Sequence, residues 1–400
     1  MKDYKFISVD DHIDIQYLPK DLWTSRVPGH LAERAPHVEV DAEDNARWVC
    51  EGQVWGNWAG VPRKGPARSF QTAIERAGVY EPGVLRPTIP EQRLQDMNLD
   101  NIEATFMFGP IAAFRCSDPE LRTAIYRAYN DWLVEFCSYD PKRLHGIAAL
   151  PGEDIQASGA ELYRLAEQGR LQQANFLIGS ANPSIYDDAW EPFWAAAEET
   201  GMIVSFHVGG GAPPGAAQQR PGGGGALGPP VEKPSSVFRT SKNFILQFLD
   251  PFHGLIAEGV LDRHAGVRVM LAEVGLGWLP WLIHEMDYRY QRLLDNKSYW
   301  DSRGGIHVTM PPSEIWKRNF WVTFQDDPVG LALLKFCNED HVLWASDYPH
   351  PDSTFPDSVR IVEEQMAEIT PAQQRKILRD NAAALYGLRT AAGVAPAADR

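Results

Sequence analysis

Side chains that can bind a divalent metal follow a short apolar segment near the start of this sequence. The run Phe6–Val9 is followed by Asp10, Asp11 and His12. Alternate residues of a strand share one face, so we expect Asp10 and His12 to project together and Asp11 to point away. A carboxylate beside an imidazole is half of a metal site. The other interpretation is a polar strand end with solvated acidic groups.

Two further candidates end other apolar runs. His207 follows the run 202–206, and Asp347 follows the run 342–346. Taken alone, His207 could be a core histidine bonded to the backbone, and Asp347 could be the N-cap of a helix. In a parallel α/β barrel, however, catalytic groups gather where the strands end. We therefore expect Asp10, His12, His207 and Asp347 to converge.

Other polar and aromatic side chains near these positions have two interpretations each. His350 lies three residues after Asp347, and it could support a metal ligand or face a substrate. Trp278 suits an aromatic pocket wall, although core packing explains it equally well. Two histidines inside an expected strand and an expected helix are interpreted as structural: His145 and His253. The sequence contains no GxSxG segment, so a serine nucleophile has no support.

The elements that must hold these residues alternate between short β-like runs and longer helical runs. Strand followed by helix recurs about eight times, which predicts βαβ units closed into a (β/α)8 barrel. The expected strands are 6–9, 102–108, 144–150, 174–178, 202–208, 267–271, 320–324 and 342–344. The expected helices are 119–137, 157–168, 190–200, 244–258, 279–294, 329–337, 359–367 and 371–386.

Three segments interrupt this alternation. We expect one barrel domain over 1–390, with an insertion at about 18–93 that packs over the C-terminal face of the barrel, and a frayed tail at 391–400. The segment 209–230 is rich in glycine and proline, which predicts a lid that orders when a ligand or a partner chain covers it. A passive surface excursion is the alternative. A phosphate cradle is disfavoured, because no Lys-Ser/Thr pair follows the glycines.

Composition excludes several classes of protein. The 400 residues carry a formal net charge of −15, which argues against a nucleic-acid-coating surface but leaves an anionic small substrate open. The four cysteines form no CxxC pair, so neither a disulfide framework nor a cysteine zinc site is expected. No apolar run approaches 18 residues, and the N-terminus has no signal-peptide core. We expect a reduced, cytoplasmic protein.

Six segments together resemble the amidohydrolase superfamily, in the branch that contains aminocarboxymuconate-semialdehyde decarboxylase, γ-resorcylate decarboxylase and many uncharacterised metal-dependent hydrolases. The similar segments are VDDHID at 9–14, RLQDMNLDNIEATFMF at 93–108, YDPKRLHGIAALP at 139–151, GMIVSFHVGG at 201–210, VMLAEVGLGWLP at 269–280 and WASDYPHPDS at 344–353. Their order and spacing carry the resemblance more than any single motif does.

The resemblance implies a distorted barrel and a metal bound by Asp10, His12, His207 and Asp347. Many members of the family open with His-x-His, whereas this sequence has Asp10 at the first position. Two carboxylates and two imidazoles suit Zn²⁺, which we expect as the single bound ion, and they tolerate Mn²⁺ or Fe²⁺. Asp14 is a weaker candidate nearby.

Glu273 stands where many members carry a histidine after the sixth strand. A glutamate can act as an acid, as a base or as a ligand to a second metal, but it cannot simply replace an imidazolium at neutral pH. It could instead cap a neighbouring element. The chemistry of the decarboxylases therefore need not transfer to this chain.

Three functions remain open, and hydrolysis of a small aromatic or cyclic carboxylic acid by a metal-activated water is the first expectation. Its expected catalytic residues are Asp347, Glu273 and His207, and its expected substrate contacts are His350 and Trp278. The alternative is non-oxidative decarboxylation of a hydroxybenzoate-like acid. The third is a metal-bearing subunit that assists a homologous partner, or an oxygen-activating site. We also expect a homo-oligomer, a dimer or tetramer, with a hetero-oligomer as the alternative.

Overall fold

The computed structural model describes residues 4–62, 72–207, 235–303, 305, 307–390 and 393–394. The glycine- and proline-rich segment 209–230, for which a lid was predicted, lies outside the described residues. Of the expected tail, residues 393–394 form a short strand, β14 (Gly393–Val394), which pairs with β13 (Arg389–Thr390). The rest of 391–400 also lies outside the described residues.

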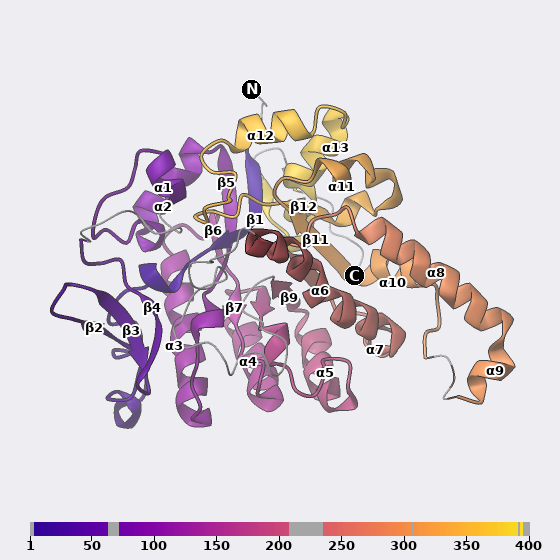
Figure 1. Ribbon diagram of the computed structural model, residues 1–400, viewed down its shortest axis with the longest axis horizontal. Helices are drawn as coiled ribbons and strands as arrows, with labels where there is room; N and C mark the ends of the chain where they lie inside the picture. The colour runs from indigo at the N-terminus through magenta and orange to yellow at the C-terminus, as the bar shows by residue number, and fades with distance from the viewer. Residues whose placement is uncertain are drawn as a thin grey trace.

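Parallel strands form the centre of the molecule (Figure 1). One sheet has the order β1-β5-β6, and a second has the order β12-β11-β10-β9-β8-β7. The strands are β1 (Phe6–His12), β5 (Ile102–Phe108), β6 (Leu144–Gly146), β7 (Ala148–Ala149), β8 (Gln173–Asn175), β9 (Ile203–His207), β10 (Val269–Ala272), β11 (Phe320–Phe324) and β12 (Val342–Trp344).

Backbone hydrogen bonds join the two sheets at both ends. Only Ile147 separates β6 from β7, and its N–H donates to Met107 O at 2.9 Å. At the other end, Asp347 N donates to Asp10 O at 2.9 Å, and His12 N donates to the backbone oxygen of Tyr348 at 2.7 Å. Counting β6 and β7 as one interrupted strand, eight parallel strands of the described residues follow one another around a distorted (β/α)8 barrel, as the sequence predicts.

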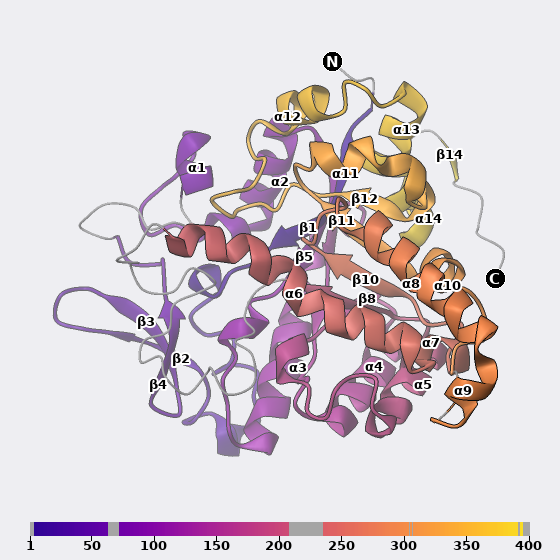
Figure 2. The ribbon, with the colours of Figure 1, turned by 45° about the vertical axis from the view of Figure 1, so that its right-hand side comes forward.

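Helices surround this ring (Figure 1). They are α2 (Pro90–Leu99), α3 (Pro119–Cys137), α4 (Ile155–Gln168), α5 (Glu191–Thr200), α6 (Ser235–Ala257), α7 (Val260–Arg263), α8 (Leu279–Asp295), α9 (Lys297–Asp301), α10 (Pro312–Asn319), α11 (Pro328–Ala332), α12 (Ser358–Gln365), α13 (Pro371–Arg375) and α14 (Asn381–Tyr386), with a π-helical turn over Lys376–Asp380. Figure 2 shows α6 running across the front of the strands. Among the described helices, none is long and apolar enough to cross a lipid bilayer.

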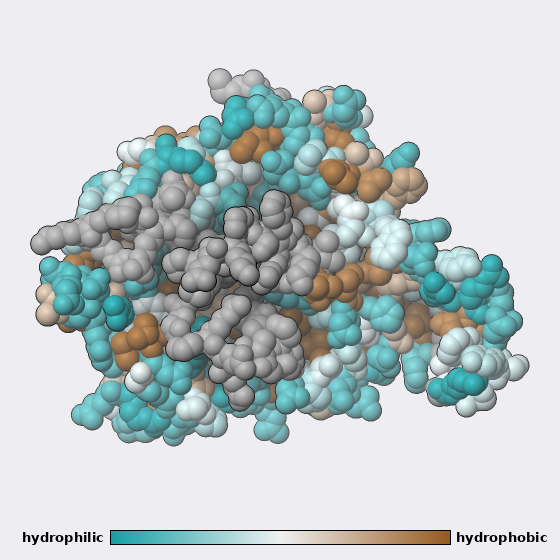
Figure 3. Space-filling model, viewed as in Figure 1, coloured by the Kyte–Doolittle hydropathy of each residue, from teal (hydrophilic) through white to brown (hydrophobic). Residues whose placement is uncertain are grey.

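Two layers of apolar side chains hold the barrel together. The interior of the ring is a small cluster, whose central members include Ile7, Val9, Phe106, Ile203, Met270 and Leu343. Tyr386 of α14 stacks on Phe106 with ring centroids 3.8 Å apart, so α14 covers one end of this interior. A larger cluster fills the space between strands and helices. In the coloured part of Figure 3, hydrophilic residues predominate and hydrophobic residues form separated patches.

The segment after β1 contains a small antiparallel sheet that the sequence analysis did not resolve into elements. It consists of β2 (His37–Val40), β3 (Ala46–Cys50) and β4 (Gln53–Asn57), followed by the short helix α1 (Thr72–Arg76). Buried tryptophans attach this segment to the barrel. Trp23 Nε1, ahead of the sheet, donates to Ile125 O of α3, and Trp55 Nε1 of β4 donates to Arg115 O after β5. Arg76 donates to backbone oxygens of the loop after β12, including that of Phe355.

Candidate metal centre

Three strands bring the four expected metal ligands to one end of the barrel. Asp10 and His12 lie at the end of β1, His207 ends β9, and Asp347 lies three residues after the end of β12. Parallel strands direct their carboxyl ends to one side, which explains the convergence. The side-chain exposure is 0% for Asp10 and Asp347, 8% for His12 and 10% for His207. These polar groups are therefore almost entirely withdrawn from water.

A bulge in β1 decides which of its acidic residues face the barrel mouth. The register between β1 and β5 shifts between Ser8 and Asp11. Ser8 and Asp11 consequently share one side, where Ser8 Oγ donates to Asp11 Oδ1 at 2.7 Å. Asp10 and His12 point the other way, as alternation at the strand end predicts.

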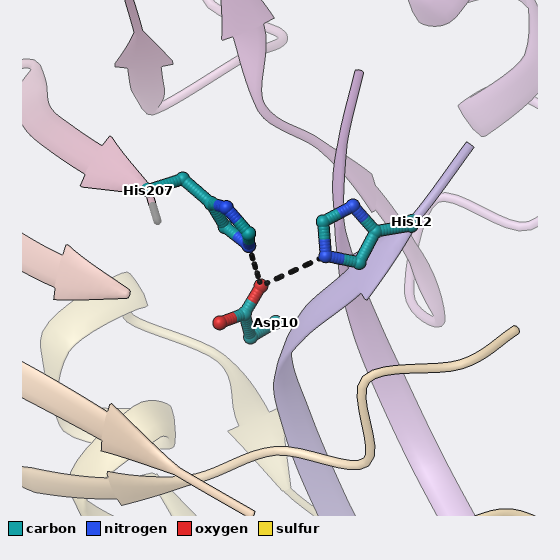
Figure 4. Close-up of side chains that lie close together, drawn as sticks. All are labelled: Asp10, His12 and His207. Carbon is teal, nitrogen blue, oxygen red and sulfur yellow. Dashed lines mark hydrogen bonds and ion pairs between the residues drawn. The ribbon is translucent and has the colours of Figure 1, made fainter. Parts of the chain in front are cut away.

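Asp10 lies between two imidazoles (Figure 4). Its Oδ1 atom is 3.1 Å from His207 Nε2 and 3.5 Å from His12 Nε2. His12 Nε2 is in turn 3.1 Å from Asp347 Oδ1. Two atoms that each lie about 2.1 Å from one ion stand about 3.0–3.4 Å apart when the angle between them is about 90–109°. The observed separations match the spacing of ligands around a single cation.

Buried atoms without a hydrogen-bond partner support this interpretation. His12 Nε2 and both carboxylate oxygens of Asp347 make no hydrogen bond of acceptable geometry with any described residue. The distance from His12 Nε2 to Asp347 Oδ1 is short, but these atoms are not aligned as donor and acceptor. Buried polar atoms left in this way cost free energy, which a cation bound between them would offset. The nitrogen and oxygen donors fit a divalent transition metal.

The electrostatics keep the two carboxylates ionised. Burial alone would raise the pKa of Asp10, but the nearby imidazoles of His207 and His12 hold it below the ordinary value. Burial likewise opposes ionisation of Asp347, and the imidazoles of His350 and His12 lower the pKa of this carboxyl. Neither group must lose a proton at neutral pH before it can bind a metal.

His350 belongs to the same cluster. Its Nδ1 is 2.8 Å from Asp347 Oδ1, its Nε2 is 3.3 Å from Asp14 Oδ1, and its ring stacks on that of His12 with centroids 3.9 Å apart. Burial lowers the pKa of His350, but the carboxylates of Asp347 and Asp14 raise it well above the ordinary value. His350 thus connects Asp14 to the candidate ligands. The potential ligand atoms form two groups that share His12, namely Asp10–His12–His207 and His12–Asp347–His350.

Glu273 lies directly after β10, and its side chain also approaches His207. Its Oε2 is 3.5 Å from His207 Nε2, and its side chain is 11% exposed. A hydroxyl holds its backbone, because Glu273 N donates to Thr323 Oγ1 at 2.8 Å and the same hydroxyl donates to Asp10 Oδ2 at 3.1 Å. Burial and then the charge of Asp347 raise the pKa of Glu273 well above the ordinary value. The side chain also forms a third potential metal group, with Asp347 and Asp352.

Asp11 faces away from the candidate ligands, but it connects the loops that carry them. Its carboxylate accepts hydrogen bonds from Ser346 Oγ at 2.6 Å, from Tyr348 N at 3.2 Å and from Arg93 Nη2 at 3.3 Å, and also from Thr105 Oγ1. Ser346 and Tyr348 flank Asp347. Asp11 therefore joins the end of β1 to the loop after β12 through hydrogen bonds that are fully buried.

The remaining expected residues have contacts elsewhere. Trp278 uses its Nε1 to bond Val274 O at 2.9 Å, and its ring packs edge-on against Phe252. His145 stacks on Phe106 below the site, and His253 is exposed on α6. The sequence analysis did not single out Asp352 or Thr323. Asp352 could have been found, since it follows Asp347 by five residues, whereas only the folded structure brings Thr323 to Asp10.

Comparison with known proteins defines the class of this molecule. A family model described as Amidohydrolase matches residues 50–388, so the chain belongs to the amidohydrolase family. Gamma-resorcylate decarboxylase of Rhodococcus jostii (strain RHA1) is 28% identical over 323 residues, which cover 75% of this chain and 88% of that protein. These matches confirm the superfamily and the branch that the sequence motifs indicate, and the chain is accordingly an enzyme of this superfamily.

Solved structures share the fold over nearly the whole chain. An amidohydrolase from Mycobacterium avium subsp. paratuberculosis K-10 superimposes with a TM-score of 0.70 at 19% identity, covering 97% of this chain and 100% of that one. A 5-carboxyvanillate decarboxylase from Novosphingobium aromaticivorans superimposes with a TM-score of 0.64 at 15% identity, covering 96% of both chains. That decarboxylase was crystallised with manganese and 4-hydroxy-3-methoxy-5-nitrobenzoic acid. At these identities the likeness concerns the fold alone.

Proposed function

We propose that this enzyme catalyses the metal-dependent, non-oxidative decarboxylation of a hydroxybenzoate-like acid. The observation that carries the proposal is the group of buried nitrogen and oxygen atoms at the barrel mouth, with His12 Nε2 and the Asp347 oxygens lacking hydrogen-bond partners. Similarity to gamma-resorcylate decarboxylase over 75% of the chain supports decarboxylation better than the hydrolysis that the sequence analysis ranked first.

The proposed ligands of one divalent ion are Asp10, His12, His207 and Asp347. When bound, such an ion draws electron density from the carboxylate and phenolic oxygens of an aromatic acid. The sequence favours zinc, whereas a structural neighbour binds manganese. Mn²⁺ is therefore the first ion to test, and Zn²⁺ is the second.

Side chains of the enzyme would hold and transfer the proton that decarboxylation requires. As the bond between the ring and the carboxylate carbon breaks, its electron pair stays on the ring carbon, CO₂ leaves, and the ring carbon takes a proton. Asp347 is buried at the mouth of the barrel, and its Oδ1 lies 2.8 Å from His350 Nδ1, close enough for a proton to pass between them once the two groups align as donor and acceptor. Glu273 lies beside His207, where it can orient an oxygen of the substrate.

Release of labelled CO₂ tests the reaction directly. Mn²⁺-loaded protein is incubated with carboxyl-¹³C forms of 2,6-dihydroxybenzoate and 5-carboxyvanillate, and ¹³CO₂ is measured by mass spectrometry. We expect release from at least one acid, with a loss of about 10²-fold or more in Asp347→Asn and His207→Ala. His253→Ala, which changes an exposed histidine outside the cluster, should keep full activity.

Other products would point to the other functions. Incorporation of ¹⁸O from labelled water into a cleaved ester or amide, without ¹³CO₂, would favour hydrolysis over this proposal. Consumption of O₂ would favour the oxygen-activating alternative. Activity that appears only after a homologous chain is added would favour the role of a metal-bearing subunit.

A further inference from the structure

We propose that Cys50 and Cys116 form a site of reversible oxidation, at which a hydroperoxide converts two thiols into a disulfide. Cys50 ends β3 of the small antiparallel sheet, and Cys116 lies in the loop between β5 and α3. Both are free thiols in this structure. A bond between them would fasten the small sheet covalently to the barrel. Neither residue is a proposed metal ligand, so the inference does not depend on the proposed reaction.

Hydrogen bonds between neighbouring residues hold the two segments side by side. Glu51 Oε2 accepts from the backbone N–H of Ser117 at 3.0 Å and from its hydroxyl at 2.9 Å. Trp55 Nε1 donates to Arg115 O at 3.0 Å. Cys116 stands between Arg115 and Ser117 in the chain, so contacts on both sides of it fix its backbone against the small sheet.

A tight turn fixes the position of Cys50. Only Glu51 and Gly52 join β3 to β4, and both have positive φ, 47° and 72°, the sign that a two-residue hairpin turn of type I′ requires. Arg34 connects this turn to the start of α3, because its Nη2 donates to Glu51 Oε1 at 2.9 Å and to Asp118 Oδ2 at 2.8 Å. The turn therefore brings Cys50 to the same place each time the sheet forms.

The two thiols are in contact within this frame. The S–H of Cys50 donates to the sulfur of Cys116, and this bond raises the pKa of Cys50 and lowers the pKa of Cys116 against the opposing effect of burial. The thiolate is the reactive form of cysteine, so Cys116 is the more reactive of the two. Cys116 is 9% exposed and lies between the exposed residues Arg115 and Ser117, so a small oxidant can reach it from the surface.

The first step of the reaction oxidises Cys116. Its thiolate attacks one oxygen of a hydroperoxide ROOH, an S–O bond forms and the O–O bond breaks. The sulfur becomes a sulfenic acid, and the peroxide is reduced to RO⁻, which takes up the proton that Cys116 released on ionising.

The second step oxidises Cys50. Its sulfur attacks the sulfur of Cys116, an S–S bond forms, the S–O bond breaks, and hydroxide leaves with the proton of Cys50 as water. Two thiols and one hydroperoxide thus give one disulfide, ROH and water.

The other two cysteines serve as an internal comparison. Burial raises the pKa of Cys137 to about 12 and that of Cys337 to about 11. Both therefore remain protonated at neutral pH, and we expect them to react slowly with a peroxide.

Counting free thiols before and after exposure to hydrogen peroxide tests the proposal. The four thiols of the unaltered protein should fall to two, and its intact mass should fall by two hydrogen atoms. Peptide mapping should find Cys50 joined to Cys116. Loss of these thiols should be about tenfold or more faster than loss of Cys137 and Cys337. Dithiothreitol should restore all four.

Variants separate the two steps. Cys50→Ser keeps a hydroxyl that can donate to Cys116 but removes the second thiol, so dimedone, which reacts with sulfenic acids, should label Cys116 in this variant after peroxide treatment. The double variant Cys137→Ser/Cys337→Ser is the matched control and should form the same disulfide as the unaltered protein. Mapping of the unaltered protein needs no variant, so it decides the matter even if Cys50→Ser fails to fold.

Thermal unfolding tests the effect of the bond. The unfolding midpoint should rise by about 2–5 °C on oxidation, because a cross-link restricts the unfolded chain, and should return after reduction. Four thiols that persist in peroxide, oxidation without a link between Cys50 and Cys116, or equal rates at all four cysteines would overturn the proposal. An unchanged midpoint in the cross-linked protein would overturn the fastening of the sheet to the barrel.

Discussion

At the scale of single residues, Asp10 and Asp11 show how two adjacent carboxylates acquire different roles. The bulge at Ser8–Asp11 directs Asp10 to the imidazoles at the barrel mouth and turns Asp11 toward Arg93, inside the protein. The residues that flank Asp347 are Ser346 and Tyr348. Of the two carboxylates, only that of Asp11 accepts hydrogen bonds from both of them among the described residues. We therefore assign Asp11 a positioning role: it holds the loop after β12 against the end of β1.

Asp11→Asn tests this role. The variant leaves the Arg93 guanidinium, which is 0% exposed, without its buried counter-charge, and breaking such a pair costs about 3–5 kcal/mol. Loss of support for the ligands should also lower metal affinity about 10–100-fold. Urea unfolding measures the first effect, and competition with a metal chelator measures the second. Glu363→Gln, an exposed carboxylate on α12, is the control; equal metal affinity in the two variants would contradict the assignment.

Thr323→Val tests the shared support of Asp10 and Glu273. The substitution keeps the shape of the side chain but removes a buried hydroxyl that accepts from Glu273 N and donates to Asp10 Oδ2. The backbone N–H of Glu273 would lose its acceptor, which should lower the free energy of unfolding by about 1–3 kcal/mol. Metal binding should weaken more than in Thr123→Val, which changes a partly exposed threonine on α3, away from the site. Unchanged binding in Thr323→Val would show that this hydroxyl does not position the site.

The residues of the proposed metal site could be predicted because each lies at, or just after, the end of an apolar strand. Asp10, His12, His207 and Asp347 required only the rule that the carboxyl ends of parallel strands meet. Thr323 lies inside β11, where its sequence neighbours give no sign of a polar contact across the barrel. The pairing of Asp14 with His350 likewise depends on a loop conformation that no local pattern encodes.

At the scale of elements, the spacing of apolar residues predicted helices and strands correctly where one face of the element is apolar. The predicted ranges 119–137, 320–324 and 342–344 coincide with α3, β11 and β12. Helix α2 was missed because its buried residues are Arg93, Asp96 and Met97, so the buried face is largely polar. The expected helix 329–337 ends at Ala332 and continues as a 3-10 turn, and the expected helix 371–386 contains a π-helical turn. Apolar spacing does not distinguish these helix types.

Asp327 connects two of these elements near the site. It caps α11 by accepting from Gly330 N at 2.7 Å, and it accepts from Leu276 N and Gly277 N in the loop that follows Glu273. We expect Asp327→Ala to cost about 1–3 kcal/mol, because several backbone donors lose their acceptor. Denaturant unfolding measures the cost, and the neighbouring Asp326→Ala, at an exposed position, should cost much less. Equal costs in the two variants would show that Asp327 does not stabilise this loop.

At the scale of the whole molecule, a buried carboxyl makes stability depend on pH. Asp100, at the end of α2, accepts from the backbone N–H and the hydroxyl of Ser358 at the start of α12. Burial raises the pKa of Asp100 to about 7, from 3.8 for the free side chain. The folded state therefore favours the protonated form, so this contribution to stability is complete below about pH 4 and is lost as the pH rises to about 7.

Asp100→Asn should remove this dependence. An amide imitates the protonated carboxyl, since its oxygen can accept from Ser358 N and its nitrogen can donate to Ser358 Oγ. Between pH 5 and pH 8, the unaltered protein should lose about 2–3 kcal/mol more unfolding free energy than Asp100→Asn loses. Urea unfolding at the two pH values gives the difference. Parallel curves for the two proteins would mean that Asp100 is ionised throughout this range.

The central claim is that Asp10, His12, His207 and Asp347 bind one divalent ion at the mouth of the barrel. An anomalous difference map, recorded at the manganese absorption edge from crystals grown with Mn²⁺, tests it most directly. The account predicts a strong peak about 2.0–2.3 Å from the ligand atoms of these four residues. A map with no peak between Asp10, His12 and His207 would contradict the account.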